Sequence, residues 1–147
     1  MKTILCIAVL SVFALASIGC GPGYKIVEAS GTVTLDGKPL SNATVLTQPI
    51  GTEDNPNPGP GSFAETDENG HFVLEFQHEA VVGAAPGECY IKIVENAAKR
   101  ESSDDTAEVV RSKVPWEYQE GGKVTYTIPE EGTDAMNFDL ESRRRRK

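Results

Sequence analysis

The sequence predicts an all-β protein, an antiparallel β-sandwich of about seven short strands. Apolar and polar residues alternate in one run after another, which is the pattern of strands with one buried face. Turn-forming residues separate the runs, and the chain of 147 residues contains 14 glycines and 9 prolines. Short strands at turn-punctuated spacing, without a strong amphipathic helix, are typical of a sandwich.

The first predicted strand covers residues 27–35, where small or apolar side chains occupy every second position. Asp36-Gly37 follows and predicts a tight hairpin turn, because this dipeptide tolerates positive φ. A second strand is predicted at 43–48. Residues 49–61 are rich in Gly, Pro, Asn and acidic residues and lack periodicity, so they predict a long exposed loop.

A second hairpin is predicted next, with its arms at 63–66 and 71–76 and its turn at 67–70. The stretch 81–87 is made largely of small residues and is expected to connect this hairpin to the next strand. That strand is predicted at 89–94, where Cys89 shares a face with two isoleucines.

The remaining chain predicts two more strands, at 124–128 and 136–140, with a turn at 130–132 between them. Residues 96–112 are polar and lack a convincing face, so they predict a mobile loop or a single helical turn at 106–111. The alternating runs define a predicted core, which consists of Val33, Val45, Phe72, Leu74, Ile91, Ile93, Tyr126 and Phe138.

Charge is distributed unevenly along the chain. Setting aside Lys2 and the five basic residues at 143–147 leaves 8 basic against 22 acidic residues between Cys20 and Ser142, a net of −14. Such a body repels phosphate backbones, which excludes nucleic acid as an expected partner of the folded domain. The basic tail at 143–147 is either a solvated end or an attachment to anionic lipid or to the acidic body of a neighbour.

The first nineteen residues predict a signal peptide for export. Lys2 is followed by an apolar run of thirteen residues, from Ile4 to Ala16, and then by small residues before Cys20. This run is shorter than the roughly 20 residues that a membrane-spanning helix needs. The predicted organisation is therefore a leader at 1–19, a lipidated N-terminus and tether at 20–24, one domain at 25–142 and the basic tail.

The end of the leader, Ser17-Ile18-Gly19-Cys20, resembles the lipobox of bacterial lipoproteins. Gly19 and Cys20 match that motif, whereas Ser17 stands where an aliphatic residue is preferred. The resemblance implies cleavage before Cys20 and acylation of its thiol, which would anchor the protein in membrane lipid. The alternative is an ordinary signal peptide with Cys20 as an incidental thiol. Cys89 then lacks a disulfide partner and is expected to be a buried, unreactive thiol.

A set of turn motifs carries a second resemblance. The motifs are Gly31-Thr32-Val33, Asp36-Gly37-Lys38-Pro39-Leu40, Asn42-Ala43-Thr44-Val45, Thr66-Asp67-Glu68-Asn69-Gly70-His71-Phe72 and Pro86-Gly87-Glu88. Together they resemble the carboxypeptidase regulatory-like domain over about residues 29–93, which implies a transthyretin-like sandwich. The chain from Val114 to Leu140 is similar to the C-terminal half of small bacterial lipoproteins built from one such domain.

The sequence carries little that predicts catalysis, a cofactor or a metal. His71 and His78 are seven positions apart, so in one continuous strand they would point to opposite faces. Asp67-x-Asn69-Gly70 predicts a turn rather than a calcium loop. Loop acids at 53–54 and 104–105 are expected to be solvated. A nucleophile elbow is absent, and the aromatic pair Trp116 and Tyr118 is expected to pack on the sandwich rather than to stack on a ligand.

The predicted protein is therefore a non-catalytic, lipid-anchored binding or structural module of the cell envelope, on the extracytoplasmic side. An envelope protein or a polysaccharide is its expected partner. The alternative is a soluble secreted accessory domain that binds a small ligand, carbohydrate or calcium.

Overall fold

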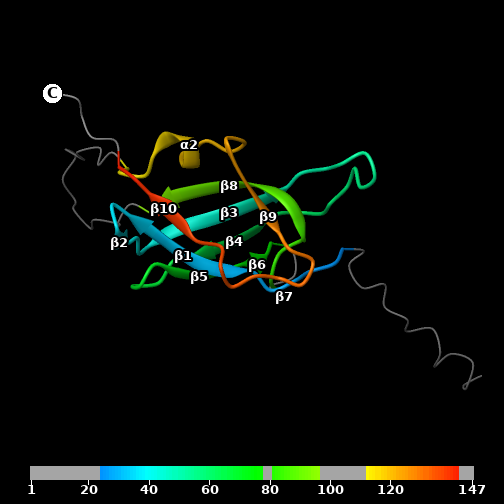
Figure 1. The fold of residues 1–147 in the computed structure, drawn as a ribbon, viewed down its shortest axis with the longest axis horizontal. Helices are drawn as coiled ribbons and strands as arrows, with labels where there is room; N and C mark the ends of the chain where they lie inside the picture. The colour runs from blue at the N-terminus through cyan, green and yellow to red at the C-terminus, as the bar shows by residue number, and fades with distance from the viewer. Residues whose placement is uncertain (1–23, 78–80, 97–111, 143–147) are drawn as a thin grey trace, which may run out of the picture.

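The computed structural model describes residues 24–77, 81–96 and 112–142, and they form an all-β structure with almost no helix (Figure 1). Within these ranges there are ten strands, several of only two residues, rather than about seven. The elements are β1 (Ser30–Leu35), β2 (Lys38–Pro39), β3 (Ala43–Pro49), β4 (Ser62–Glu65), β5 (His71–Val73), β6 (Glu75–Phe76), β7 (Val81–Val82), β8 (Gly87–Glu95), α2 (Trp116–Gln119), β9 (Val124–Ile128) and β10 (Phe138–Leu140).

The strands form two sheets that enclose a common core, consistent with a β-sandwich. The larger sheet has the order β7-β6-β4-β3-β8-β9 and is antiparallel throughout. The smaller one has the order β10-β1-β2, and β5 also pairs with β1. Val45 in β3 lies between Ala64 of β4 and Ile93 of β8, so its side chain belongs to the buried face that the alternation predicted.

The prediction of a purely antiparallel structure is wrong at one place, because β1 and β10 run parallel, with Val33 opposite Phe138. Side chains reinforce this pairing across the exposed face. The Thr32 hydroxyl donates to Asn137 Oδ1 at 2.9 Å, and the Thr34 hydroxyl donates to Asp139 Oδ1 at 2.6 Å. Two segments about 105 residues apart in the sequence are thereby held together.

The predicted hairpin with arms at 63–66 and 71–76 also needs correction. β5 pairs with β1 in the smaller sheet, whereas β6 pairs with β4 in the larger one. The chain changes sheets at Leu74, which is fully buried and whose amide donates to the Ala29 carbonyl at 2.9 Å. A strand that switches sheets closes a corner of the sandwich. Its alternation is unbroken, so the sequence pattern does not reveal the switch.

The predicted core is confirmed, with Tyr126 partly rather than fully buried. Phe138 lies at the centre of an aromatic cluster that joins the two sheets. Its ring is stacked on Phe72 at a centroid distance of 6.3 Å, and Tyr126 meets it edge-on at 6.0 Å. Tyr118 of α2 adds a third contact, also edge-on, at 6.4 Å.

The predicted turns are confirmed. Asp36 and Gly37 have φ values of 52° and 74°, the left-handed conformation that a two-residue hairpin between β1 and β2 requires. Asp67 Oδ1 accepts backbone N–H groups of Asn69 at 2.8 Å and His71 at 2.9 Å, which fixes the turn before β5. Residues 50–57 are without strands and largely exposed, as expected of the long loop.

The segment before β9 packs on the sandwich, as predicted, but unevenly. Val114 is buried and Tyr118 contacts Phe138, whereas the Trp116 side chain is 38% exposed and has Lys123 Nζ over its ring at 5.7 Å. The loop predicted at 96–112 lies outside the described residues except for its two end positions, and so does the alternative helical turn at 106–111. The sequence also left β7 unpredicted, because a two-residue edge strand carries no periodicity.

Candidate functional site

The first described residues of the domain, Tyr24 and Lys25, contact the sandwich through their side chains. Cys20 and the predicted leader lie outside the described residues, but the described chain begins at Tyr24, only four positions later. The Tyr24 ring packs against Phe76 at a centroid distance of 5.9 Å, and Lys25 Nζ lies 2.5 Å from a Glu130 carboxylate oxygen. Four residues span at most about 14 Å. Any group attached at Cys20 is therefore held close to this end of the domain.

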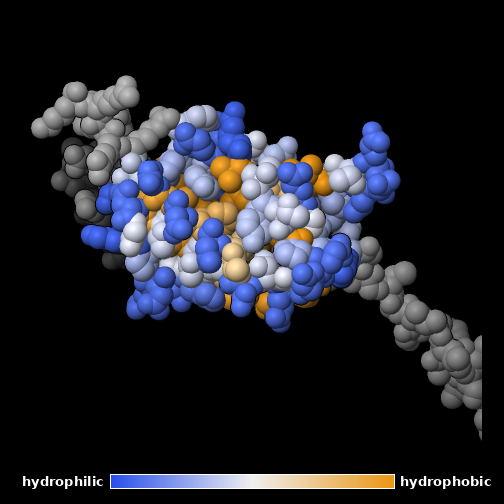
Figure 2. Space-filling view, in the orientation of Figure 1, coloured by the Kyte–Doolittle hydropathy of each residue, from blue (hydrophilic) through white to orange (hydrophobic). Residues whose placement is uncertain are grey.

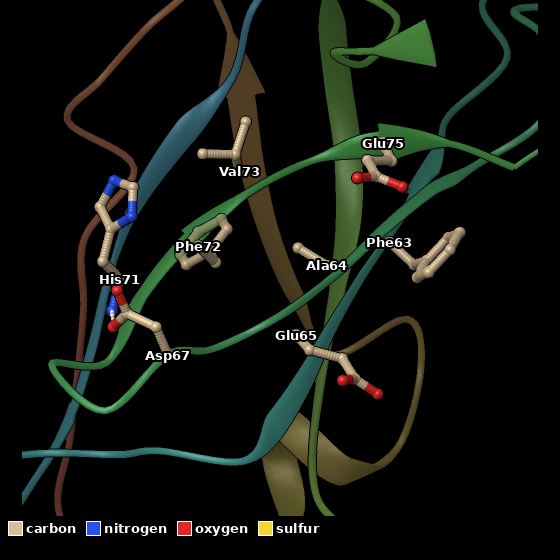
Figure 3. Close-up of a pocket in the computed structure, with 8 residues that line it drawn as sticks. All are labelled: Phe63, Ala64, Glu65, Asp67, His71, Phe72, Val73 and Glu75. Carbon is tan, nitrogen blue, oxygen red and sulfur yellow. Dashed lines mark hydrogen bonds between the residues drawn. The ribbon is translucent and has the colours of Figure 1, made fainter. Parts of the chain in front are cut away.

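One concave surface of the described residues is a groove of ≈ 450 Å³ (Figure 3). It runs over β4, β5 and β6, at the corner where the chain changes sheets. Asp67 and His71 lie at one end, and Phe63 and Glu75 lie at the other. The corner creates the groove, because β5 and β6 diverge to different sheets on either side of Leu74.

The groove combines apolar surface with negative charge. Phe63 is 39% exposed and Val73 is 41% exposed, so both present apolar surface to the groove. The exposed carboxylates of Glu65, Asp67 and Glu75 surround them. Such a surface can pack against an apolar or sugar face while the carboxylates accept hydrogen bonds from hydroxyl or cationic groups.

A second hollow, of ≈ 610 Å³, lies between the Asp36 turn and α2. Its lining mixes charges, with Asp36 and Lys113 both present, and includes Trp116. Asp36 is already engaged there, because its carboxylate accepts the Ser142 backbone N–H at 2.9 Å.

Cys89 behaves as the sequence predicts. The residue is 1% exposed on the inner face of β8, and its Sγ contacts the Tyr126 carbonyl oxygen at 3.3 Å. Burial raises the pKa of the thiol from 9.0 to about 12, with the nearby Glu88 charge adding to the increase and the bond to Tyr126 opposing it. A thiol with this pKa stays protonated at neutral pH and is a poor nucleophile.

The histidines and loop acids that the sequence offers as possible metal ligands are scattered. His71 is exposed beside the Asp67 turn, and His78 lies outside the described residues. Glu53 and Asp54 are exposed in the long loop, whereas 104–105 are not described. Within residues 24–77, 81–96 and 112–142, no three His, Cys, Asp or Glu side chains gather as a metal site would require.

Sequence reasoning missed the groove, since most of its residues come from exposed positions of three strands and a turn, and their meeting depends on the sheet switch. The one available signal was Phe63, a large aromatic residue on the polar side of its alternating run. In the part of the chain that the structure describes, no helix has the length and hydropathy to span a bilayer. No protein-family model, curated protein or solved structure matches this chain.

Proposed function

We propose that this protein is exported, anchored in membrane lipid through an acylated Cys20, and held on the extracytoplasmic side of the cell envelope. The observation that carries the proposal is the packing of Tyr24, four positions after Cys20, against Phe76 at a centroid distance of 5.9 Å. A leader-like sequence ends at Cys20, and a residue only four positions later already contacts the sandwich. This arrangement suits a domain that is displayed at a membrane surface.

The sandwich itself serves as a non-catalytic binding or structural module, with the corner groove as the binding surface. Exposed Phe63 and Val73 supply packing area, and three carboxylates supply acceptors and negative charge. The expected partner is an envelope protein or polysaccharide that presents donor or cationic groups. The net charge of −14 between Cys20 and Ser142 favours such a partner over an anionic one.

A transthyretin-like fold of the carboxypeptidase regulatory-like kind is the finer form of this proposal. Its support comes from the two sheets together with the turn motifs that carry the resemblance. Asp36-Gly37 and Asp67 to Gly70 both form the tight turns expected of these motifs, and Gly70 has a φ of 72°. An experimental structure whose strand order differs from that of transthyretin-like sandwiches would contradict this assignment of the fold.

The alternative remains a soluble secreted accessory domain that binds a small ligand, carbohydrate or calcium. Detergent partitioning separates the two, because an acylated protein enters the detergent phase. The intact mass of membrane-extracted protein is expected to show a chain that starts at Cys20 and carries acyl groups. A soluble mature chain with an unmodified Cys20 thiol, or membrane association that persists in the Cys20→Ser protein, would contradict the anchor.

The binding role is tested by capturing the partner from envelope extract, once with the wild-type domain and once with a Phe63→Ala variant. Tyr90→Ala is the matched control, because Tyr90 is 37% exposed but does not line the groove. The partner should be lost with Phe63→Ala and kept with Tyr90→Ala. Equal capture by both variants would remove the groove from the proposal.

A further inference from the structure

Three exposed apolar side chains lie at the edge of the larger sheet. Tyr24, Val81 and Val82 are 37%, 42% and 50% exposed. Tyr24 packs on the Phe76 ring at 5.9 Å, and Val81 is the partner of Phe76 across β6 and β7. Val82 is the partner of Glu75, so its side chain lies on the other face of the same edge strand. We call these three residues the apolar rim. Figure 2 shows apolar surface along this lower margin of the domain, over β7.

The rim lies at the end of the domain where the chain departs toward Cys20. Figure 1 shows the described chain beginning at one end of the sandwich and finishing, with β10, at the other. α2, with Trp116, lies away from Tyr24 in the same view. Since Tyr24 is itself part of the rim, a lipid on Cys20 is within about 14 Å of it.

We infer that the apolar rim rests on the bilayer surface when Cys20 is acylated, so that the domain has a fixed orientation on the membrane. The inference rests on the proposed lipid anchor. The rim would contact the boundary between headgroups and acyl chains, where tyrosine is enriched and where exposed aliphatic groups lose contact with water. The short tether leaves the domain little freedom to hold this surface away from lipid.

Neighbouring charges set the depth of the contact. Glu75 is the partner of Val82 across the strand pair, and the ion pair of Lys25 with Glu130 flanks Tyr24. Charged groups are costly in hydrocarbon, so they limit the rim to the headgroup level. The contact is therefore shallow, and Trp116 is held clear of the acyl chains.

Tryptophan fluorescence offers a direct test, because Trp116 is the only tryptophan of the chain. The acylated full-length protein is placed in phosphatidylcholine vesicles with and without brominated acyl chains. The native protein should keep its emission. The Trp116→Phe/Val82→Trp variant should lose about half of its emission or more, because an interfacial side chain reaches about 5 to 10 Å into the boundary region.

A Trp116→Phe/Tyr24→Trp variant repeats the measurement in case the change at Val82 disturbs the edge strand, and it should also be quenched. If both variants are acylated and vesicle-bound but unquenched, the rim inference is overturned while the anchor stands. If the protein carries no acyl group and stays out of the vesicles, the anchor and the rim fail together. Blue-shifted emission that bromine does not quench would show a second copy covering the rim instead, and this would also overturn the inference.

Discussion

Gly31 of β1 lies directly against the backbone of Met136, in the segment that leads into β10. A Cβ atom added to Gly31 would overlap the carbonyl oxygen and carbon of Met136. The two Met136 atoms belong to the backbone and cannot move aside easily, because the Met136 amide donates to the Ser30 carbonyl at 3.1 Å. Glycine is therefore required here by close approach and not by an unusual φ.

Gly31→Ala is expected to destabilise the domain by about 1 to 3 kcal/mol or more, the usual cost of forcing extra atoms into a packed interior. Denaturant unfolding measures the change. Gly121→Ala is the control, because a Cβ at Gly121 meets nothing within 4 Å. Equal stability of the two variants would show that β1 and the Met136 segment are not in contact.

Phe72→Ala and Phe138→Ala are each expected to cost about 3 to 5 kcal/mol, since both rings are buried. Their stacking at 6.3 Å adds a coupling of about 0.5 to 1.5 kcal/mol, which a double-mutant cycle reports. Phe63→Ala should cost far less, because its ring is 39% exposed. Additive effects of the two core changes would argue against the stacked pair.

Asp67→Ala removes the acceptor of two backbone N–H groups, those of Asn69 and His71. The loss is expected to be about 1 kcal/mol, a typical net value for an exposed hydrogen-bonded turn. Asp67→Asn keeps a side-chain oxygen and should lose less. Glu68→Ala, a change at a neighbouring exposed acid, controls for the loss of charge alone.

Ser62 Oγ is buried and has no hydrogen-bond partner among the described residues. Ser62→Ala is therefore expected to be neutral or stabilising by about 1 kcal/mol, because it removes a desolvated hydroxyl without breaking a bond. Thr47→Val provides the contrast. The Thr47 hydroxyl donates to the Ser62 carbonyl at 3.3 Å and accepts its N–H at 3.2 Å, so its removal should destabilise.

The raised pKa of the Cys89 thiol determines how this residue makes the stability of the domain depend on alkaline pH. Because burial raises the pKa of its thiol from 9.0 to about 12, the folded state binds more protons than the unfolded state between these values. The free energy of unfolding therefore falls as pH rises from about 9 toward 12, through this residue. Cys89→Ala should remove that part of the slope. The native thiol should also resist alkylation at pH 8 until the protein is unfolded.

Local pattern was enough to predict the strands whose alternation is long, such as β3 and β8, and the turns at Asp36 and Asp67. It could not predict which sheet each half of 71–76 joins, because Leu74 is buried in either arrangement. The parallel β1 and β10 pair depends on contacts across about 105 residues, which no local period encodes. β7 was too short to show any period.

The same reasoning limits what could be predicted of the site. The leader pattern identifies Cys20 as the candidate residue for acylation, and the acylation itself stays a prediction. The groove depends on exposed residues of β4, β5 and β6 that come together only because the chain turns a corner. The apolar rim likewise joins Tyr24 to a strand more than fifty positions later, and only the folded structure places them side by side.

The pairing of β1 with β10 determines when the domain can finish folding. β1 is the first strand of the described chain, yet one of its edges stays open until Leu140 is available to cover it. Closing so long a loop is entropically costly and slow, as for other structures dominated by distant contacts. A chain that is synthesised or threaded through a membrane from its N-terminus must therefore carry an incomplete sheet for almost its whole passage. Loss of the final strand would leave that exposed edge open to aggregation.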